Sequence, residues 1–375
     1  MKYISEFRDG ALAQGLAAAI RRAVQPGREY RLMEFCGGHT HAIARYGIAD
    51  LLPPALQLIH GPGCPVCVLP VGRIDQAIRL ALERELILCA YGDTLRVPAS
   101  AGLSLLRARG RGADVRMVYS PLDAVRLAQA NPTRQVVFLA IGFETTTPPT
   151  AVAVKQAQDA GLDNFSLLCN HVLTPAAMHA ILATPGARLD GFIGPAHVST
   201  VIGSRPYAVF AREHRKPVVI AGFEPLDVLQ AILMLVQQLN SGRAEVENQF
   251  SRAVSPDGNL KAQALVDEVF ELRPEFEWRG LGSVAASALR LRPAFALFDA
   301  ELRHAMPHVA VPDHKACECA AILRGEKRPE QCRIFGTACT PDSPVGSCMV
   351  SPEGACAAHY SYGRLRTVPP PVRTP

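Results

Sequence analysis

The segment QVVFLAIGF, residues 135–143, decides the fold class of this chain of 375 residues. Its apolar residues are continuous rather than alternating, which is typical of a parallel strand that is covered on both faces. An amphipathic stretch, Pro148–Ala160, follows it and is predicted to be a helix. Together they predict one strand–helix unit of an α/β fold.

Seven other apolar runs have the same texture, and amphipathic stretches lie between several of them. The runs are RLMEF (31–35), ALQLIH (55–60), ELILCAYG (85–92), DVRMVYS (114–120), FSLLCNH (165–171), LDGFIG (189–194) and KPVVIAGF (216–223). The predicted helices among them include Gly72–Arg84, Pro121–Ala130 and Pro175–Ala183. Strands that alternate with helices predict parallel α/β layers.

Two strand ends resemble each other, and the texture of the chain then changes. AIGFETTTP (140–148) and IAGFEPLD (220–227) both run from a strand through Gly-Phe-Glu into a helix, which suggests two related α/β halves. Leu226–Leu239 and Leu260–Leu272 are predicted to be long helices. From Ala310 onward the chain is rich in Cys, Pro and Gly. Because such a segment cannot easily bury a core alone, we expect it to fold around a bound group.

The charge and the hydropathy exclude several classes of protein. The net charge is +5 and the basic residues are scattered, so there is no electrostatic footprint for nucleic acid. The N-terminal stretch has no apolar core of secretory length, and Gln residues interrupt Leu226–Leu239. We therefore expect a cytoplasmic protein without a membrane span. In that compartment, the 11 cysteines point to metal or redox chemistry rather than to a disulfide framework.

Reactive side chains gather where the predicted strands end. In parallel α/β sheets, ligands bind outside the carboxyl ends of the strands. The side chains at those ends are Cys36, His39, His41, His60, Cys64, Cys67, Asp93, Glu144, His171, His197 and Glu224. Thiols, imidazoles and carboxylates on one edge predict a reactive cleft.

Cys36 is the first candidate for a reactive group. It precedes Gly37 and Gly38 at a strand-to-helix turn, where free backbone N–H groups and a helix N-terminus would lower the pKa of a thiol. We predict a reactive or metal-binding thiolate with His39 or His41 as its neighbour. The alternative is a buried cysteine in a tight turn, with histidines that cap the helix.

Cys64 and Cys67 form a Cys-Pro-Val-Cys motif in a loop. Such a pair can close a small disulfide or supply two metal ligands. A zinc site would need two further ligands, and none lies nearby in the sequence. The motif therefore favours a redox pair, and two unrelated loop cysteines are the remaining alternative.

Six cysteines fall within forty residues near the C-terminus: Cys317, Cys319, Cys332, Cys339, Cys348 and Cys356. Four thiolates can hold a [4Fe–4S] cluster or a zinc ion. Zinc ribbons usually bring their ligands in CxxC pairs, whereas here the intervals are long, irregular and interleaved with apolar residues. The pattern therefore favours an iron–sulfur cluster over zinc.

Two carboxylates and two further cysteines have less specific settings. Glu144 and Glu224 each follow Gly-Phe at a strand end, where they would orient a substrate, transfer protons or cap a helix. These alternatives stay open. Cys89 and Cys169 lie inside apolar strands and are predicted to be packing residues.

Five motifs give the chain a resemblance to a known family. They are CGGHTHAI (36–43), HGPGCPVCV (60–68), GFETT (142–146), GFEP (222–225) and FGTACTPDSPVGSCMVSPEGACAAHY (335–360). They span nearly the whole chain, and together they resemble the HypD family of hydrogenase maturation factors.

The resemblance implies a fold and a function. The fold would be two similar parallel-sheet α/β domains around a cleft, residues 1–125 and 126–225, and a helical, Cys-rich domain, residues 226–375, that binds a [4Fe–4S] cluster. The function would be that of a scaffold on which the Fe(CN)2CO group of [NiFe]-hydrogenases is assembled. A small partner, HypC, would share the iron, and HypE would deliver cyanide. The large subunit of the hydrogenase would be an indirect partner.

The resemblance also implies roles for single residues. Cys36 would bind the nascent iron, which carries cyanide and CO, and His39 would be its neighbour. Cys64 and Cys67 would be a redox pair. Two other functions remain to be weighed: a general thiol–disulfide oxidoreductase with an iron–sulfur cluster, and a zinc-stabilised binding protein.

The same resemblance implies a ligand set for the cluster. Cys332, Cys339 and Cys356 match cluster ligands, and the fourth would be Cys317 or Cys319. Cys348 would then be a spare.

Overall fold

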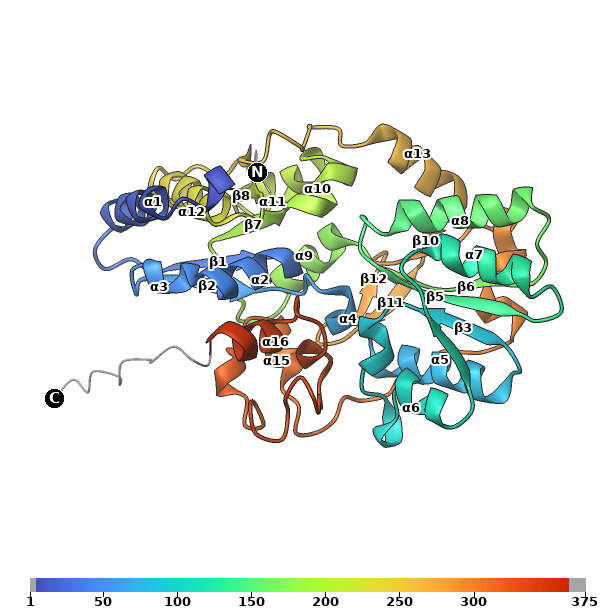
Figure 1. Cartoon of the computed structure of the whole chain (residues 1–375). Coiled ribbons are helices and arrows are strands. Elements are labelled where there is room, and N and C mark those ends of the chain that lie inside the picture. The colour runs from blue at the N-terminus through green and yellow to red at the C-terminus, as the bar shows by residue number, and fades with distance from the viewer. Residues whose placement is uncertain (1–4, 364–375) are drawn as a thin grey trace.

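Two parallel β-sheets lie side by side in the fold, which is known from a computed structural model that describes residues 5–363 (Figure 1). Sheet A has the strand order β2-β1-β7-β8-β9, and sheet B has the order β4-β3-β5-β6. All neighbours within these two sheets run parallel. The predicted α/β fold with parallel sheets is therefore confirmed.

The first eight strands coincide with the eight apolar runs of the sequence. Sheet A contains β1 (Tyr30–Glu34), β2 (Leu56–His60), β7 (Gly191–Pro195), β8 (Val218–Ala221) and a ninth strand, β9 (Val246–Asn248). Sheet B contains β3 (Ile87–Ala90), β4 (Asp114–Met117), β5 (Val136–Gly142) and β6 (Phe165–His171). Every residue of β5 and β6 is buried, as the continuous apolar runs predict.

The division of the chain between the sheets differs from the expected domain boundaries at residues 125 and 225. The chain begins in sheet A, builds all four strands of sheet B, and then returns to sheet A for β7, β8 and β9. The segments 1–125 and 126–225 therefore each contribute strands to both sheets. The apolar runs predict strands but not their partners, since β1 pairs with β7 across more than 150 residues.

Helices accompany both sheets. The longer ones are α1 (Gly10–Ala23), α2 (Gly37–Tyr46), α5 (Val71–Glu83), α7 (Pro121–Ala130), α8 (Thr147–Asp159), α9 (Thr174–Leu182), α12 (Pro225–Asn240) and α13 (Leu260–Val269). The shorter ones are α3 (Ile48–Leu51), α4 (Pro65–Val68), α6 (Leu105–Gly110), α10 (Ala196–Ile202), α11 (Ala208–Arg212), α14 (Ala300–Arg303), α15 (Cys319–Leu323) and α16 (Ala355–Ala358). Among residues 5–363, no helix has both the length and the apolar character that a membrane span requires.

Short 3₁₀ turns link these elements. They are η1 (Ser5–Arg8), η2 (Asp93–Arg96), η3 (Ser100–Gly102), η4 (Arg205–Tyr207), η5 (Pro293–Phe298), η6 (Pro329–Gln331) and η7 (Ser347–Met349), and one π-helical turn, η8 (His359–Gly363), ends the described chain.

Helix α7 illustrates how the local sequence sets a boundary. The Ser120 hydroxyl accepts a hydrogen bond from the Leu122 N–H at 3.2 Å, and the Asp123 carboxylate accepts one from the Ser120 N–H at 3.0 Å. This capping box satisfies donors that the first helical turn leaves free. Pro121 fits the first helical position, where no N–H is needed. The helix therefore starts where the sequence predicts.

The segment 260–272 differs from the single helix that was predicted. Helix α13 ends at Val269, and β10 (Phe270–Leu272) pairs antiparallel with β13 (Leu289–Leu291). Phe270 and Leu289 are buried in the core of sheet B, so tertiary packing outweighs the local helical pattern here. Between these strands, β11 (Glu275–Trp278) and β12 (Gly282–Ala285) form a hairpin.

Residues 226–363 do not form one helical domain. Helix α12 packs on β8 of sheet A, and α13 packs on α8 beside sheet B. The Cys-rich part, residues 310–363, contains only short helices and turns, coloured red in Figure 1. It lies against both sheets. The largest buried cluster runs through residues of both sheets to Cys319, Cys339, Cys348 and Cys356. The cysteines thus share a core with the α/β part.

Candidate functional site

Cys36 lies at the junction of β1 and α2 and is the N-cap of the helix. The loop that precedes Cys64 packs against this turn. The Gly37 N–H donates to the Gly63 carbonyl at 3.2 Å, and a side chain at Gly63 would collide with the Cys36 backbone. The loop of Cys36 is therefore in direct contact with the loop that precedes Cys64.

The two glycines after Cys36 make room for neighbouring side chains. A Cβ at Gly37 would collide with Glu353 of the Cys-rich part, and a Cβ at Gly38 would lie 2.7 Å from the Phe223 ring. Glycine at these positions therefore lets the Cys-rich part and the end of β8 approach the Cys36 turn.

The Cys36 thiol has an environment that differs from the predicted one. The backbone N–H groups of Gly38 and His39 do favour the thiolate, as the glycine turn predicted. Burial has the largest effect, however, and together with the charge of Glu353 it raises the pKa of the Cys36 thiol far above its ordinary value. In the protein alone Cys36 is therefore a protonated thiol, and a metal ion would have to displace its proton.

Sequence reasoning missed Glu34, which organises this turn. Glu34 is fully buried at the end of β1. Its carboxylate accepts hydrogen bonds from the Cys36 N–H at 2.8 Å, from the Thr40 hydroxyl and from His60 Nδ1 at 2.8 Å. The signal was a single acidic residue within the apolar run RLMEF. A buried carboxylate with three donors thus joins the two cysteine loops.

His39 faces the end of β8 with its imidazole. Its Nε2 lies 3.0 Å from the carbonyl oxygens of Ala221 and Gly222. Since carbonyls only accept, Nε2 carries the proton and Nδ1 is an acceptor. The buried Nδ1 has no partner among the described residues, and burial lowers the pKa of His39. His39 is thus a neutral histidine that supports the turn.

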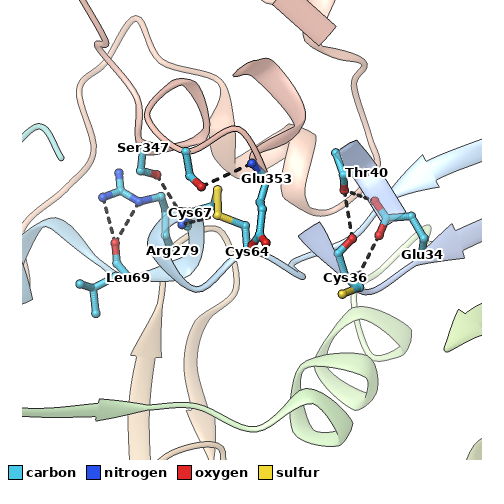
Figure 2. Close-up of a disulfide and its surroundings, with 10 residues drawn as sticks. Glu34, Cys36, Thr40, Cys64, Cys67, Leu69, Arg279, Ser347 and Glu353 are labelled. Atoms are coloured by element: carbon cyan, nitrogen blue, oxygen red, sulfur yellow. Dashed lines mark hydrogen bonds between the residues drawn. A yellow bond between two sulfur atoms is a disulfide. The ribbon is translucent and has the colours of Figure 1, made fainter. Parts of the chain in front are cut away.

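Cys64 and Cys67 form a disulfide across helix α4 (Figure 2). Both residues are buried, and the Cys64 sulfur accepts the Cys67 N–H at 3.2 Å. Ser347, from the Cys-rich part, donates its hydroxyl to the Cys67 carbonyl at 3.0 Å. In Figure 2 the disulfide lies between Arg279 on one side and Cys36 on the other. The two sulfurs of the Cys-Pro-Val-Cys motif are thus bonded to each other, and their role as a redox pair stays a prediction.

Three of the C-terminal thiols contact one another. A hydrogen bond to Cys319 raises the pKa of the Cys317 thiol, burial raises it further, and the Arg279 charge opposes both. A hydrogen bond to Cys319 likewise raises the pKa of Cys356. Gly346 packs against this group, since a Cβ there would collide with the Cys317 sulfur and lie 2.7 Å from the Cys319 sulfur.

Cys339 lies beside these three thiols. The Cys339 sulfur accepts the Val345 N–H at 3.4 Å. Burial raises the pKa of Cys339, and the charges of Cys317 and Cys319 contribute to the increase. Among residues 5–363, no three His, Cys, Asp or Glu side chains already stand at metal-coordination distances. The thiols of Cys317, Cys319, Cys339 and Cys356 are thus gathered in one place.

Comparison with known proteins identifies the family. The family model HypD, described as the hydrogenase formation hypA family, matches residues 11–363. The chain belongs to the HypD family of hydrogenase maturation factors. It is 66% identical to the hydrogenase maturation factor HypD of Cupriavidus necator, with 98% of this chain and 99% of that protein covered. The HypD proteins of Azotobacter vinelandii and Escherichia coli K12 are 68% and 45% identical, with 98% and 96% of this chain and 98% of each relative covered.

In this HypD-family chain the remaining strand-end residues divide between the two sheets. His197 lies near His39 at sheet A, with its ring 4.3 Å from that of Phe223. His171 is buried at sheet B, where Nε2 bonds the Thr150 hydroxyl at 3.0 Å. The predicted single edge is therefore two edges, because the strands belong to two sheets.

Glu144 and Glu224 have different settings in the HypD fold. Glu144 is buried, and its carboxylate accepts the Thr174 N–H and hydroxyl at 2.8 and 2.9 Å. Burial raises the pKa of Glu144 to about 7. Glu224 is the N-cap of α12 and forms an ion pair with Arg8. Capping, one of the alternatives that the sequence left open, thus describes Glu224.

Tyr207 connects the surroundings of Glu144 with those of Cys36. It is fully buried, and its hydroxyl accepts that of Ser199 at 3.1 Å. Burial raises the pKa of Tyr207, and the neighbouring Glu144 and Cys36 add to the increase when they are ionised. Glu144 also lines an apolar cavity of about 670 Å³ with residues of α9 and of β12.

Proposed function

We propose that this chain is a redox-active scaffold on which the Fe(CN)2CO group of [NiFe]-hydrogenases is assembled. The proposal rests on its membership of the HypD family and on one observation, the direct contact between the Cys36 loop and the loop of the Cys64–Cys67 disulfide. A soft thiolate suits low-spin iron that carries cyanide and CO. In this proposal iron is cargo, and Cys36 binds it after losing its proton.

The proposed partners follow from the cargo. HypC would share the iron with Cys36, HypE would deliver cyanide, and the large hydrogenase subunit would receive the finished group. The proposed setting is the cytoplasm, where free thiols such as Cys36 stay reduced.

A [4Fe–4S] cluster is proposed for the C-terminal cysteines. The gathered thiols of Cys317, Cys319, Cys339 and Cys356 and the close approach of Gly346 support it, because four thiolates in a dry setting suit such a cluster. Cys332 is supported by its position in the sequence alone. When bound, the cluster would supply single electrons. The Ser347 hydroxyl, which donates to the Cys67 carbonyl, would hold the disulfide beside the cluster.

One histidine would position the Cys36 turn, and one carboxylate would exchange protons. His39 would hold the Cys36 turn against β8 through its bonds to Ala221 and Gly222. Glu144, with its pKa of about 7, would exchange protons near neutral pH.

The test uses the chain purified without oxygen together with HypC. Wild type is expected to bind iron and to show cyanide and CO infrared bands. Cys36→Ala is expected to lose both, whereas Cys89→Ala, which removes a buried thiol from β3, is expected to keep both. A Cys36→Ala protein that retains the bands would refute the assignment of Cys36.

A general thiol–disulfide oxidoreductase is the second candidate, because the Cys64–Cys67 disulfide is formed. That function predicts turnover of disulfide substrates that needs both cysteines and is independent of Cys36. The same Cys36→Ala protein distinguishes the two functions.

A further inference from the structure

Arg279 caps the turn that carries the Cys64–Cys67 disulfide. It lies at the tip of the β11–β12 hairpin, and the residue is only 5% exposed. Its backbone N–H donates to the Val68 carbonyl at 2.8 Å. Its guanidinium donates to the Leu69 carbonyl from Nε at 3.1 Å and from Nη2 at 2.9 Å. These carbonyls end helix α4, and the last carbonyls of a helix have no partners within it.

The same hairpin tip contacts the Cys-rich part. Arg279 forms an ion pair with Asp313. At Gly280 an added Cβ would lie 3.1 Å from the Ala320 Cα, and Arg324 donates to the Gly280 carbonyl at 2.7 Å. Ala320 belongs to α15, which begins at Cys319. The tip is therefore wedged between the disulfide turn and the helix that carries Cys319.

The charges around the turn are unequal on its two sides. Figure 2 shows Arg279 and Ser347 on one side of the disulfide, and Glu353 between the disulfide and Cys36 on the other. Reduction of the disulfide creates thiols that ionise to thiolates, which a buried cation stabilises and an anion destabilises. Arg279 is the buried cation bonded to this turn.

We propose that Arg279 is a positioning residue that holds the Cys64–Cys67 turn against the Cys-rich part and shifts its disulfide–dithiol equilibrium toward the dithiol. The inference deepens the proposed function, on which its biological meaning rests, but the equilibrium belongs to the chain alone. In the reaction with dithiothreitol, the Cys64–Cys67 bond breaks, the reagent closes its own disulfide, and its two thiol protons pass to the protein sulfurs.

The experiment equilibrates the full chain, purified without oxygen, with mixtures of reduced and oxidised dithiothreitol. The peptide with Cys64 and Cys67 is then trapped and counted by mass spectrometry. Arg279→Gln is expected to lower the equilibrium constant for reduction about tenfold, which is about 30 mV for a two-electron couple. Arg279→Lys keeps the charge without the fork of donors and is expected to change it by less than about threefold.

A variant that shifts the equilibrium constant in the opposite direction separates the effect of charge from the effect of packing. Asp313→Asn removes the anion that offsets Arg279 and is expected to raise the equilibrium constant. An unchanged constant in Arg279→Gln would overturn the proposal. So would Asp313→Asn and Arg279→Gln shifting in the same direction, since that would indicate a general loosening of the turn.

Two controls complete the design. Arg273→Gln removes another buried arginine, which donates to the Leu289 carbonyl at 3.0 Å and pairs with Glu301, and is expected to leave the constant unchanged. Ser347→Ala removes the bond to Cys67 without a change of charge and is expected to have less effect than Arg279→Gln. Circular dichroism checks the fold of each variant. Failure of the proposed function would instead appear as missing infrared bands with the Arg279 effect intact.

Discussion

The buried carboxylate of Glu34 holds the backbone N–H of Cys36 at 2.8 Å, only two residues along the chain. The same carboxylate accepts His60 Nδ1 at 2.8 Å, from the neighbouring strand. The end of β1, the end of β2 and the start of α2 thus meet at one acidic group. The position of the Cys36 thiol depends on this group, although Glu34 itself bears none of the predicted chemistry.

Replacing Glu34 by Gln is expected to lower the free energy of unfolding by about 2–3 kcal/mol. The amide keeps one acceptor oxygen but presents an N–H₂ group to a donor, and buried hydrogen bonds to charged groups contribute most. Urea denaturation measures the change. Glu29→Gln, at an exposed position just before β1, serves as the control and is expected to change stability by less than about 0.5 kcal/mol. Equal stability of the two variants would contradict the role of Glu34.

Removing the charge of Glu353 is expected to make Cys36 more reactive. Burial and then Glu353 raise the pKa of the Cys36 thiol, so Glu353→Gln lowers that pKa and increases the thiolate fraction at any given pH. The alkylation rate of Cys36 by iodoacetamide at pH 8 is expected to rise by about three- to tenfold. Mass spectrometry of the peptide measures it. Asp342→Asn, at an exposed acid of the same Cys-rich part, should leave the rate unchanged, and a slower rate in Glu353→Gln would argue against this charge effect.

Glu144 is expected to make stability depend on pH. Its pKa in the folded chain is about 7, above the ordinary value of 4.5, so the folded state binds the proton more tightly than the unfolded state. Stability therefore falls as the pH rises from about 4.5 to 7, by up to about 3 kcal/mol. In Glu144→Gln this loss should be absent.

Urea unfolding of both proteins at pH 5 and pH 8 measures the difference. Relative to wild type, Glu144→Gln should gain stability between the two pH values. Glu275→Gln, at an exposed residue of β11, controls for the loss of a carboxylate. The same pH dependence in wild type and in Glu144→Gln would show that another group is responsible.

Metal analysis of the protein purified without oxygen tests the C-terminal cysteines. Wild type is expected to contain about four irons and four acid-labile sulfides. Cys356→Ala and Cys339→Ala should lose most of both, and Cys169→Ala, in β6, should lose neither. Parallel measurements on Cys332→Ala, Cys317→Ala and Cys319→Ala identify the remaining ligands. Stoichiometric zinc without sulfide would instead support the zinc-stabilised binding protein.

Gly63→Ala tests the contact between the two cysteine loops. The added methyl group would collide with backbone atoms of Phe35 and Cys36, which cannot rotate away. Overpacking of this kind is expected to lower the free energy of unfolding by about 1–3 kcal/mol. Gly110→Ala, where a Cβ meets nothing within 4 Å, is the matched control. Equal stability of the two variants would mean that the loops separate easily.

Most strands and helices were predictable because burial on both faces leaves continuous apolar runs. FSLLCNH coincides with β6, and the helix predicted at Pro121–Ala130 is α7. The segment 270–272 was not predictable in this way, because Phe270 is held in a strand by a partner about twenty residues later.

The candidate site was predictable as a set of thiols but not as an arrangement. Strand ends and cysteine spacing indicated Cys36, Cys64 and Cys67. The residues that set their environment come from distant parts of the chain: Arg279 binds the disulfide turn, and Glu353 raises the pKa of Cys36. Periodicity and spacing report on neighbours along the chain, so contacts of this range leave no local signal.

The return of the chain to sheet A after β6 means that sheet B is an insertion into the other sheet. A fragment of residues 1–125 would carry two strands of each sheet and complete neither. The Cys64–Cys67 motif lies where the inserted part begins, directly after β2. Dissection of this protein should therefore remove the whole insertion between β2 and β7 and rejoin its ends. A single cut beside the disulfide would instead separate β1 and β2 from the strands β7, β8 and β9 that complete their sheet.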